Sequence, residues 1–215
     1  MEQTLSQTTK MIRCCLMLVM VFCTNLSSAQ NLDRQILNEV HVHRNASLDN
    51  VMNAISISAY PVAIGLPLVQ FIHGFAGHHE QSLRYGLETT TGLVVATAIT
   101  YGLNYSVRRE RPFIGHPEYK PYDASDTSPS FPSGHTSLAF QAATTLSIEY
   151  PKWYVIVPSY AWAGAVGYSR IHLGEHYPSD VLAGALIGAA SAYASHEVNK
   201  WLRKKWEKKI PKVVD

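Results

Sequence analysis

Residues 131–148 read FPSGHTSLAFQAATTLSI, a Pro-Ser-Gly turn that opens directly into an uncharged run of small and apolar residues. Four more uncharged runs occur in the chain, at residues 51–72, 89–107, 153–169 and 181–195. Several are rich in Ala, Gly, Ser and Thr, and such small residues let helices approach one another closely. None alternates apolar and polar residues as a half-buried strand does. The sequence therefore predicts an all-α helical bundle of about five helices.

Composition places the chain between a soluble helical protein and a membrane protein. Charged residues make up 16% of the 215 residues, against about 25% in average soluble proteins. Hydrophobic residues make up 47%, and the formal net charge of +2 gives no indication of nucleic acid binding. The length allows one domain with a substantial core. Only the runs at 51–72 and 89–107 approach the ~20 residues that cross a bilayer untilted.

The first 29 residues have the pattern of a signal peptide. A basic stretch precedes a short apolar core at residues 14–23, and small residues favour cleavage after Ala29. An uncleaved anchor helix is the alternative. All three cysteines lie in this segment, so cleavage would leave an exported domain, residues 30–215, without disulfides.

The C-terminal tail, which begins at about residue 200, supplies a test of topology. Residues 200–212 carry seven Lys or Arg and one Glu. If the five runs all cross a membrane and residue 30 lies outside, the tail lies inside, as the positive-inside rule prefers. The connections 108–130 and 170–180 then lie together on the outer side. The alternative is a solvated basic helix end on a soluble protein.

Two further segments predict local structure. In residues 31–44, a helix would place Leu32, Ile36, Leu37 and Val40 on one face, so that it packs against the body or lies at a membrane surface. The connection at 108–130 is polar and rich in Pro, Asp and Ser, which predicts an exposed loop.

Three segments carry side chains suited to phosphate chemistry. Arg111 precedes Pro112, and its planar guanidinium can bind phosphate oxygens in a bidentate manner. Ser133, Gly134 and His135 open a predicted helix, whose first N–H groups and dipole favour an anion. Gly134 allows a ligand close to the backbone, and the Ser133 hydroxyl adds a donor. A Ser133 that only caps the helix is the alternative, but it leaves His135 unexplained.

The third segment runs from Ser169 to Asp180. Pro178 suits the first position of the last helix, which places His176 just before that helix and Asp180 in its first turn. A carboxylate there can reach back to one ring nitrogen of His176 and leave the other free to attack. A capping Asp beside an unrelated loop His is the alternative.

Together and in this order, the three segments resemble the type 2 phosphatidic acid phosphatase superfamily. Its pattern is Lys-x6-Arg-Pro, then Pro-Ser-Gly-His, then Ser-Arg-x5-His-x3-Asp. The second motif is complete at residues 132–135, and the third is complete in the segment just described. The first motif has Arg111 and Pro112, but Asn104 stands where the family pattern has lysine. The resemblance covers roughly residues 50–196.

The resemblance implies a metal-independent phosphatase that works through a phosphohistidine. His176 would be the nucleophile, Asp180 its orienter, and His135 the acid that protonates the leaving oxygen and then activates water. The phosphoryl oxygens would be bound by Arg111, Arg170, Ser133, Gly134 and the Asn104 position. Asn104 brings no charge, so we expect reduced activity or an altered substrate unless Arg108 or Arg109 takes the place of the lysine.

The expected substrate is a lipid phosphate or diphosphate, such as phosphatidic acid, phosphatidylglycerophosphate, a polyprenyl diphosphate or a lipid A phosphate. We expect the enzyme in the plasma membrane with its site on the extracytoplasmic side. No cofactor or metal is expected, because no His, Asp and Glu cluster has metal-ligand spacing. The remaining histidines of interest, His73, His78, His79 and His172, are expected in loops or at the surface.

Other functions remain open at this stage. The short apolar runs also fit a soluble exported acid phosphatase that acts on small phosphoesters. A vanadate-dependent haloperoxidase shares the phosphate-binding residues, although such enzymes are generally much larger. A phospholipid-binding protein without catalysis is the fourth alternative. The sequence indicates no protein partner and no oligomeric state.

Overall fold

The structure is a computed structural model that describes residues 26–207. This part of the chain is built from helices and contains no strand. The elements are α2 (Leu26–Leu37), the π-helical turn η1 (Asn38–Val42), the 3-10 turn η2 (Ala46–Leu48), α3 (Asp49–Ile57), α4 (Ala59–Gly77), α5 (Glu80–Val107), α6 (Pro112–Gly115), α7 (Gly134–Glu149), α8 (Trp153–His172) and α9 (Pro178–Glu207). The predicted all-α bundle is confirmed. Most of the predicted signal peptide lies outside the described residues.

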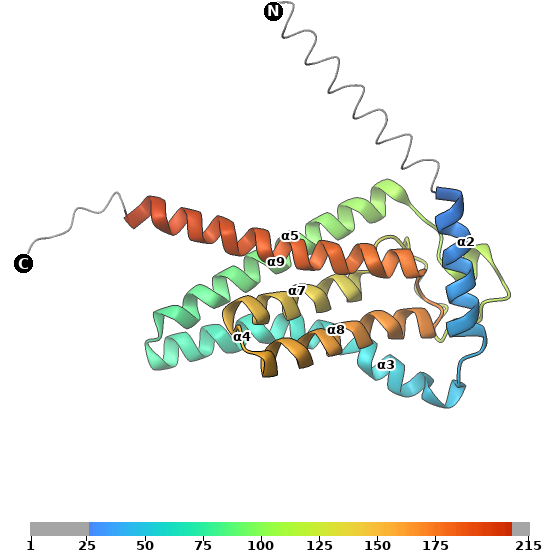
Figure 1. Ribbon diagram of the computed structural model, residues 1–215, viewed down its shortest axis with the longest axis horizontal. Helices are drawn as coiled ribbons and strands as arrows, with labels where there is room; N and C mark the ends of the chain where they lie inside the picture. Colours follow the sequence, from blue (N-terminus) through green and yellow to red (C-terminus); the bar gives the residue numbers. More distant parts are fainter. Residues whose placement is uncertain (1–25, 208–215) are drawn as a thin grey trace, which may run out of the picture.

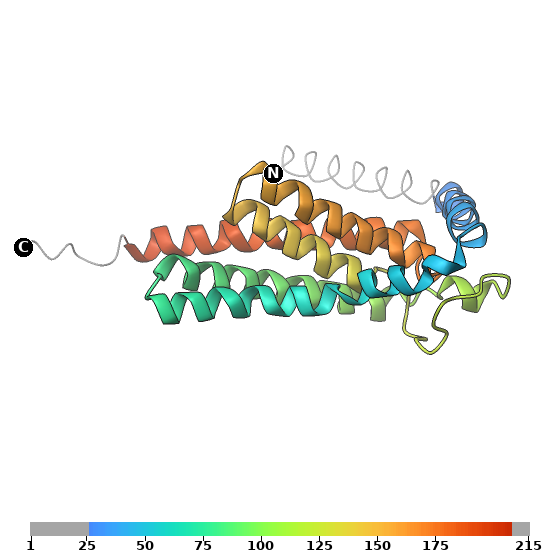
Figure 2. The ribbon, with the colours of Figure 1, turned by 90° about the horizontal axis from the view of Figure 1, so that it is seen from below.

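The five long helices α4, α5, α7, α8 and α9 run lengthwise beside one another, and α2 lies across one end of the bundle (Figure 1, Figure 2). Helix α7 packs against α4, α5, α8 and α9. It is therefore the central helix, and its N-terminus is held on several sides.

All five predicted runs are helical, but the first is interrupted. The chain bends at Ser58, between α3 and α4. Pro61 has no N–H to donate to the carbonyl of Ile57, and its ring crowds that carbonyl. The bend therefore lies one turn before the proline, where the helix loses a backbone hydrogen bond.

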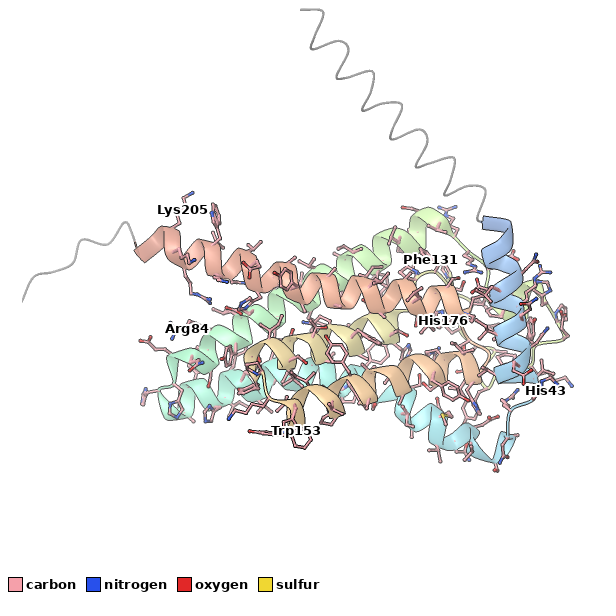
Figure 3. The ribbon with its side chains drawn as sticks, in the orientation of Figure 1. His43, Arg84, Phe131, Trp153, His176 and Lys205 are labelled. Carbon is pink, nitrogen blue, oxygen red and sulfur yellow. The ribbon has the colours of Figure 1, made fainter. Side chains whose placement is uncertain are left out.

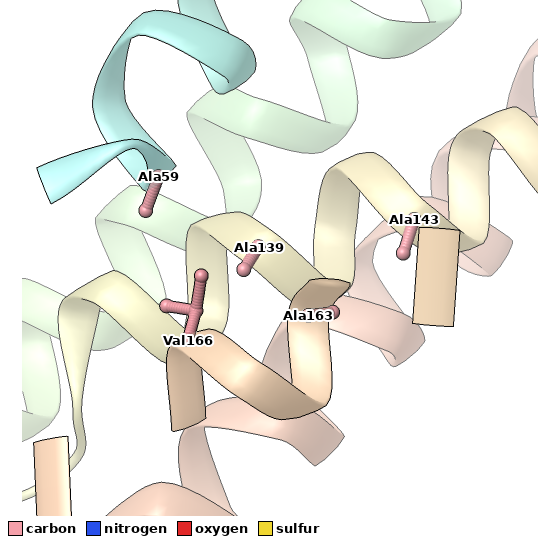
Figure 4. Packing of buried hydrophobic residues seen from close by; sticks show 5 residues of the cluster. All are labelled: Ala59, Ala139, Ala143, Ala163 and Val166. Atoms are coloured by element: carbon pink, nitrogen blue, oxygen red, sulfur yellow. The ribbon is translucent and has the colours of Figure 1, made fainter. Parts of the chain in front are cut away.

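The interior of the bundle is built from small side chains. The cluster around α7 consists of alanines and a single valine, and Figure 4 shows them from close by: Ala59, Ala139, Ala143, Ala163 and Val166. On α9, Gly184 and Gly188 face the backbone of α7. A Cβ atom on Gly184 would lie 2.5 Å from the Ser133 carbonyl oxygen, and one on Gly188 would overlap the Ser137 carbonyl. Helices α7 and α9 can therefore approach closely only because these positions lack side chains.

The large apolar side chains point outward. On α4, α5, α8 and α9 they are more than half exposed: Ile64, Leu68, Val69, Ile72, Val94, Val157, Leu182 and Leu186. A small and polar interior surrounded by an apolar exterior suits a bilayer better than water. By length and composition, one helical segment of the part between residues 26 and 207, Ala46–Gly77, is long and apolar enough to cross a membrane.

The two connections that carry the motifs meet at one end of the bundle. Figure 3 shows Phe131 and His176 at the end near α2, whereas Arg84, Trp153 and Lys205 lie at the opposite end. The expectation that the connections 108–130 and 170–180 share one side, opposite the basic tail, is confirmed for the described residues.

Two local predictions hold only in part. In α2, Leu32 is 55% exposed, and the buried face consists of Asp33, Leu37 and, one turn on in η1, His41. Of the predicted apolar face, Leu37 packs against the body, beside the polar Asp33 and His41, whereas Leu32 and Ile36 stay exposed. The connection 108–130 is largely exposed, as predicted, but it also forms the short helix α6 and buries Tyr119.

Candidate active site

A cavity of about 350 Å³ opens at the end of the bundle where the motifs meet. At its polar end it is lined by Asn104, Arg111, Asp126, Gly134, His135 and His176. From there it continues between α4 and α5 along mainly apolar side chains: Tyr60, Ala63, Ile64, Leu93, Thr97 and Tyr101. The cavity thus joins a polar pocket to an apolar groove.

His176 lies in the short connection between α8 and α9 and is 3% exposed. Its Nδ1 lies 2.8 Å from the backbone carbonyl oxygen of Ser130. A carbonyl oxygen can only accept, so Nδ1 carries the proton and Nε2 keeps a free lone pair. Burial, together with the charges of Arg170 and Arg111, holds the pKa of His176 well below its usual range. The imidazole is therefore neutral and suited to act as a nucleophile.

Asp180 does not make the expected hydrogen bond to His176. Its Oδ2 lies 3.7 Å from His176 Nδ1, too far for a hydrogen bond, and instead accepts the backbone N–H of Tyr177 at 2.9 Å. Its Oδ1 accepts from Arg109 at 2.7 Å. The hydrogen bond predicted to come from Asp180 is thus made by the Ser130 carbonyl, and Asp180 instead bonds to the backbone of Tyr177 and to Arg109.

Arg111 and Arg170 are brought together by Glu175, which sequence reasoning missed. Glu175 Oε2 lies 3.0 Å from Arg111 Nη1 and 3.6 Å from Arg170 Nη2. Arg170 also donates to the Ser56 hydroxyl at 2.7 Å, which anchors it to α3. Its Nε is buried and has no hydrogen-bond partner among the described residues. Arg170 is not among the residues that line the cavity, so its positive charge lies beside the cavity and not on its surface.

Asp126 occupies the outer side of Arg111. Its Oδ2 lies 2.5 Å from Arg111 Nη2, and its side chain lines the cavity. Burial would raise the pKa of Asp126, but a hydrogen bond from Ser128 and the charge of Arg111 outweigh it and lower the pKa. An anionic carboxylate therefore pairs with Arg111 at the wall of the cavity.

The N-terminus of α7 supplies the second histidine. Gly134 is the first helical residue, so the first N–H groups of α7 have no partner within the helix. Ser133 occupies the N-cap position, but its side chain does not cap the helix, and its Oγ accepts from Thr136 at 2.9 Å. The ring of His135 meets the ring of Tyr60 edge to face, with 4.7 Å between centroids. This contact places His135 at the junction of the polar pocket and the groove.

Asn104 is turned toward the backbone that precedes α7. Its Nδ2 donates to the carbonyl of Phe131 at 2.7 Å and has longer contacts to those of Pro129 and Pro132, at 3.3 and 3.4 Å. The residue that departs from the family pattern thus supports the loop that carries the second motif.

Neither neighbouring arginine replaces the missing lysine. Arg109 donates to Asp33 and Asp180, both at 2.7 Å. Arg108 adopts a left-handed conformation at the end of α5 and donates to the Tyr105 carbonyl. Neither Arg108 nor Arg109 therefore takes the place of the lysine that the family pattern has at position 104.

The other histidines divide into two groups. His73, His78 and His79 are exposed near the turn between α4 and α5, as predicted. His172 was wrongly expected in a loop or at the surface, because it is 3% exposed and pairs with Asp49 at 3.0 Å. Among the residues that the structure describes, no group of three or more His, Cys, Asp or Glu could hold a metal ion.

Comparison with known proteins places the site in a family context. A family model described as the PAP2 superfamily matches residues 86–204. The undecaprenyl-diphosphatase of Sulfolobus acidocaldarius is 31% identical over 55% of this chain, and the match covers 57% of its own length. Undecaprenyl-diphosphatase BcrC of Bacillus subtilis is 30% identical over 74% of this chain and 79% of its own length.

A solved structure shares the fold. The crystal structure of a transmembrane PAP2 type phosphatidylglycerolphosphate phosphatase from Bacillus subtilis aligns with a TM-score of 0.65 and 21% identity. The alignment covers 94% of this chain and 98% of the Bacillus chain. The similarity thus extends beyond the motifs to the whole helical arrangement.

Proposed function

The chain belongs to the PAP2 superfamily, and on that premise we propose that it hydrolyses the phosphate or diphosphate of a membrane lipid. The observation that carries this proposal is the cavity, which joins Arg111 and two histidines to an apolar groove. A lipid phosphate needs both parts, because its head group requires cationic donors and its chain requires apolar surface.

The proposed reaction proceeds in two steps. Nε2 of His176 attacks phosphorus, and His135 protonates the departing oxygen of the lipid. Water activated by His135 then cleaves the phosphohistidine and releases phosphate. Arg111, Arg170 and the first N–H groups of α7 neutralise the charge on the equatorial oxygens, which is the main electrostatic demand of phosphoryl transfer.

The apolar groove favours a lipid over a small phosphoester. It lies between α4 and α5, whose outward faces carry exposed residues such as Ile64, Leu68 and Val94. A lipid chain could therefore remain in the bilayer while its head group reaches His176. The named relatives act on a polyprenyl diphosphate, and a polyprenyl chain would suit a groove of this kind.

We further propose that the site faces the extracytoplasmic side. Lys204 and Lys205 lie at the end of α9, opposite the motifs. Basic residues flanking a span favour the cytoplasmic side, so the tail would lie inside and His176 outside. The N-terminal signal peptide, with cleavage after Ala29, is part of the same proposal.

The test is phosphate release by the purified full chain in detergent with excess chelator. The panel contains undecaprenyl diphosphate, phosphatidic acid, phosphatidylglycerophosphate, lipid A and a soluble aryl phosphate. We expect release from a lipid substrate that survives chelation and is lost in His176→Ala. The matched control is His43→Ala, since His43 is exposed and outside the cavity. Release from the aryl phosphate alone, or full activity in His176→Ala, would overturn the proposal.

A further inference from the structure

Helix α2, which lies outside the family-matched segment, is hydrogen-bonded to the start of α9, next to the connection that carries His176. Asp33 lies in α2, is 4% exposed, and precedes residues 86–204, which the family model matches. Its Oδ1 accepts the backbone N–H of Ser179 at 2.8 Å, which satisfies one free donor at the start of α9. Its Oδ2 accepts from the Ser179 hydroxyl at 2.6 Å and from Arg109 at 2.7 Å.

Arg109 passes this contact on toward the nucleophile. Its guanidinium lies between Asp33 and Asp180 and stacks on the ring of Tyr177 at 3.9 Å. Asp180 in turn accepts the Tyr177 N–H and lies 3.7 Å from Nδ1 of His176. A continuous series of charged contacts thus runs from α2 to the ring that would attack phosphorus.

The α2 segment is itself firmly docked on this loop. Leu37 is fully buried against Tyr119 and Tyr177. Nδ1 of His41 lies 2.8 Å from the His172 carbonyl oxygen, at the end of α8. The burial of Leu37 and the hydrogen bond of His41 together hold this segment in place. The carboxylate of Asp33 therefore has a defined position.

We propose that Asp33 is a positioning residue, which holds Arg109 against Asp180 and thereby fixes His176 for attack. This inference rests on the proposed function. Asp33, Arg109 and Asp180 do not line the cavity, so they act on the histidine and not on the substrate. Loss of Asp33 should therefore lower kcat and leave KM nearly unchanged.

The first experiment compares Asp33→Asn, Asp33→Glu and the wild type in the detergent assay. Asparagine keeps the shape but turns an N–H toward donors, so we expect kcat to fall about 10- to 100-fold, the scale of a small misplacement of a reacting group. KM should stay within about twofold. Glutamate restores the charge and should recover part of the rate. Glu39→Gln removes an exposed acid six residues further along the chain and should match the wild type.

The second experiment separates positioning from general stability. If Asp33 acts through Arg109, the double variant Asp33→Asn with Arg109→Gln should be no slower than Arg109→Gln alone. Independent multiplication of the two losses would overturn the inference, as would unchanged kcat in Asp33→Asn or a loss confined to KM. A melting temperature recorded for each variant identifies those that unfold. An Asp33→Glu variant that folds but recovers no rate would also count against the inference. No phosphate release by the wild type would instead refute the proposed function.

Discussion

Replacing Asn104 with aspartate should lower kcat/KM by about 5- to 150-fold. The amide of Asn104 donates to the carbonyl oxygen of Phe131 at 2.7 Å and has longer contacts with two neighbouring carbonyls. Aspartate has the same shape but can only accept when ionised. The same backbone would then face a carboxylate, and the loop that begins α7 would move away from it.

The magnitude follows from the bond that is lost. Of the three contacts, only the one to Phe131 has the length of a good hydrogen bond. The bond is partly buried, and a carbonyl left unpaired out of water costs about 1–3 kcal/mol. Since about 1.4 kcal/mol corresponds to a tenfold change in rate, the loss spans roughly 5- to 150-fold if the displacement reaches His135 and the first N–H groups of α7.

The assay is steady-state phosphate release, with two further substitutions at the same position. Asn104→Leu removes the donor without adding charge and should lose less activity than Asn104→Asp. Asn104→Lys supplies donors and a positive charge and should raise kcat/KM. Asn199→Asp is the matched control, because Asn199 donates only to Ser195 within α9. A folded Asn104→Asp enzyme with wild-type kcat/KM would refute the reasoning.

Three further predictions concern other parts of the site. Asp126→Asn should free Arg111 and lower both KM and the inhibition constant for inorganic phosphate about 3- to 10-fold. An unchanged inhibition constant in steady-state kinetics would show that Asp126 does not compete with phosphate for Arg111. Because the pKa of His176 is lowered well below 6.5, the nucleophile stays unprotonated in mild acid, and the acid limb of kcat/KM for a diphosphate should lie below pH 6.5; a limb above that pH in a profile from about pH 4 to 8 would contradict the neutral imidazole. Gly188→Val should lower the melting temperature and kcat together, since its side chain would overlap the Ser137 carbonyl, whereas Gly164→Val, which meets nothing within 4 Å, should melt near the wild type.

The parts of the site that could be predicted are those encoded in local sequence. His135 opens its helix directly after a Pro-Ser-Gly turn, and His176 precedes Pro178, so their places relative to helix ends follow from short-range rules. The regular spacing of the apolar runs predicts helices that alternate in direction. This alternation brings both helix ends to the same end of the bundle. Neither inference requires knowledge of which helices touch.

The missed contacts depend on tertiary packing. Ser130 holds His176 through a backbone carbonyl, which any residue type would supply, so no side-chain pattern could reveal it. Asp33 meets Ser179 across most of the chain, and an acid on a helix facing the solvent is the common case. Only Glu175 had a local signal, because an acid between Arg170 and His176 has a cation close by in sequence.

On the proposed function, the charges around the cavity predict that the absence of the lysine matters most for a diphosphate. Arg111 and Arg170 share Glu175, and Asp126 takes up the remaining positive charge when no substrate is bound. Displacement of Asp126 by a phosphoryl group leaves one net positive charge from these side chains. With an amide at Asn104, the N-terminal N–H groups of α7 must supply the rest of the stabilisation, and their effect falls off within one helical turn. The close packing that fixes α7 in the bundle is therefore also what keeps those N–H groups within reach of phosphate.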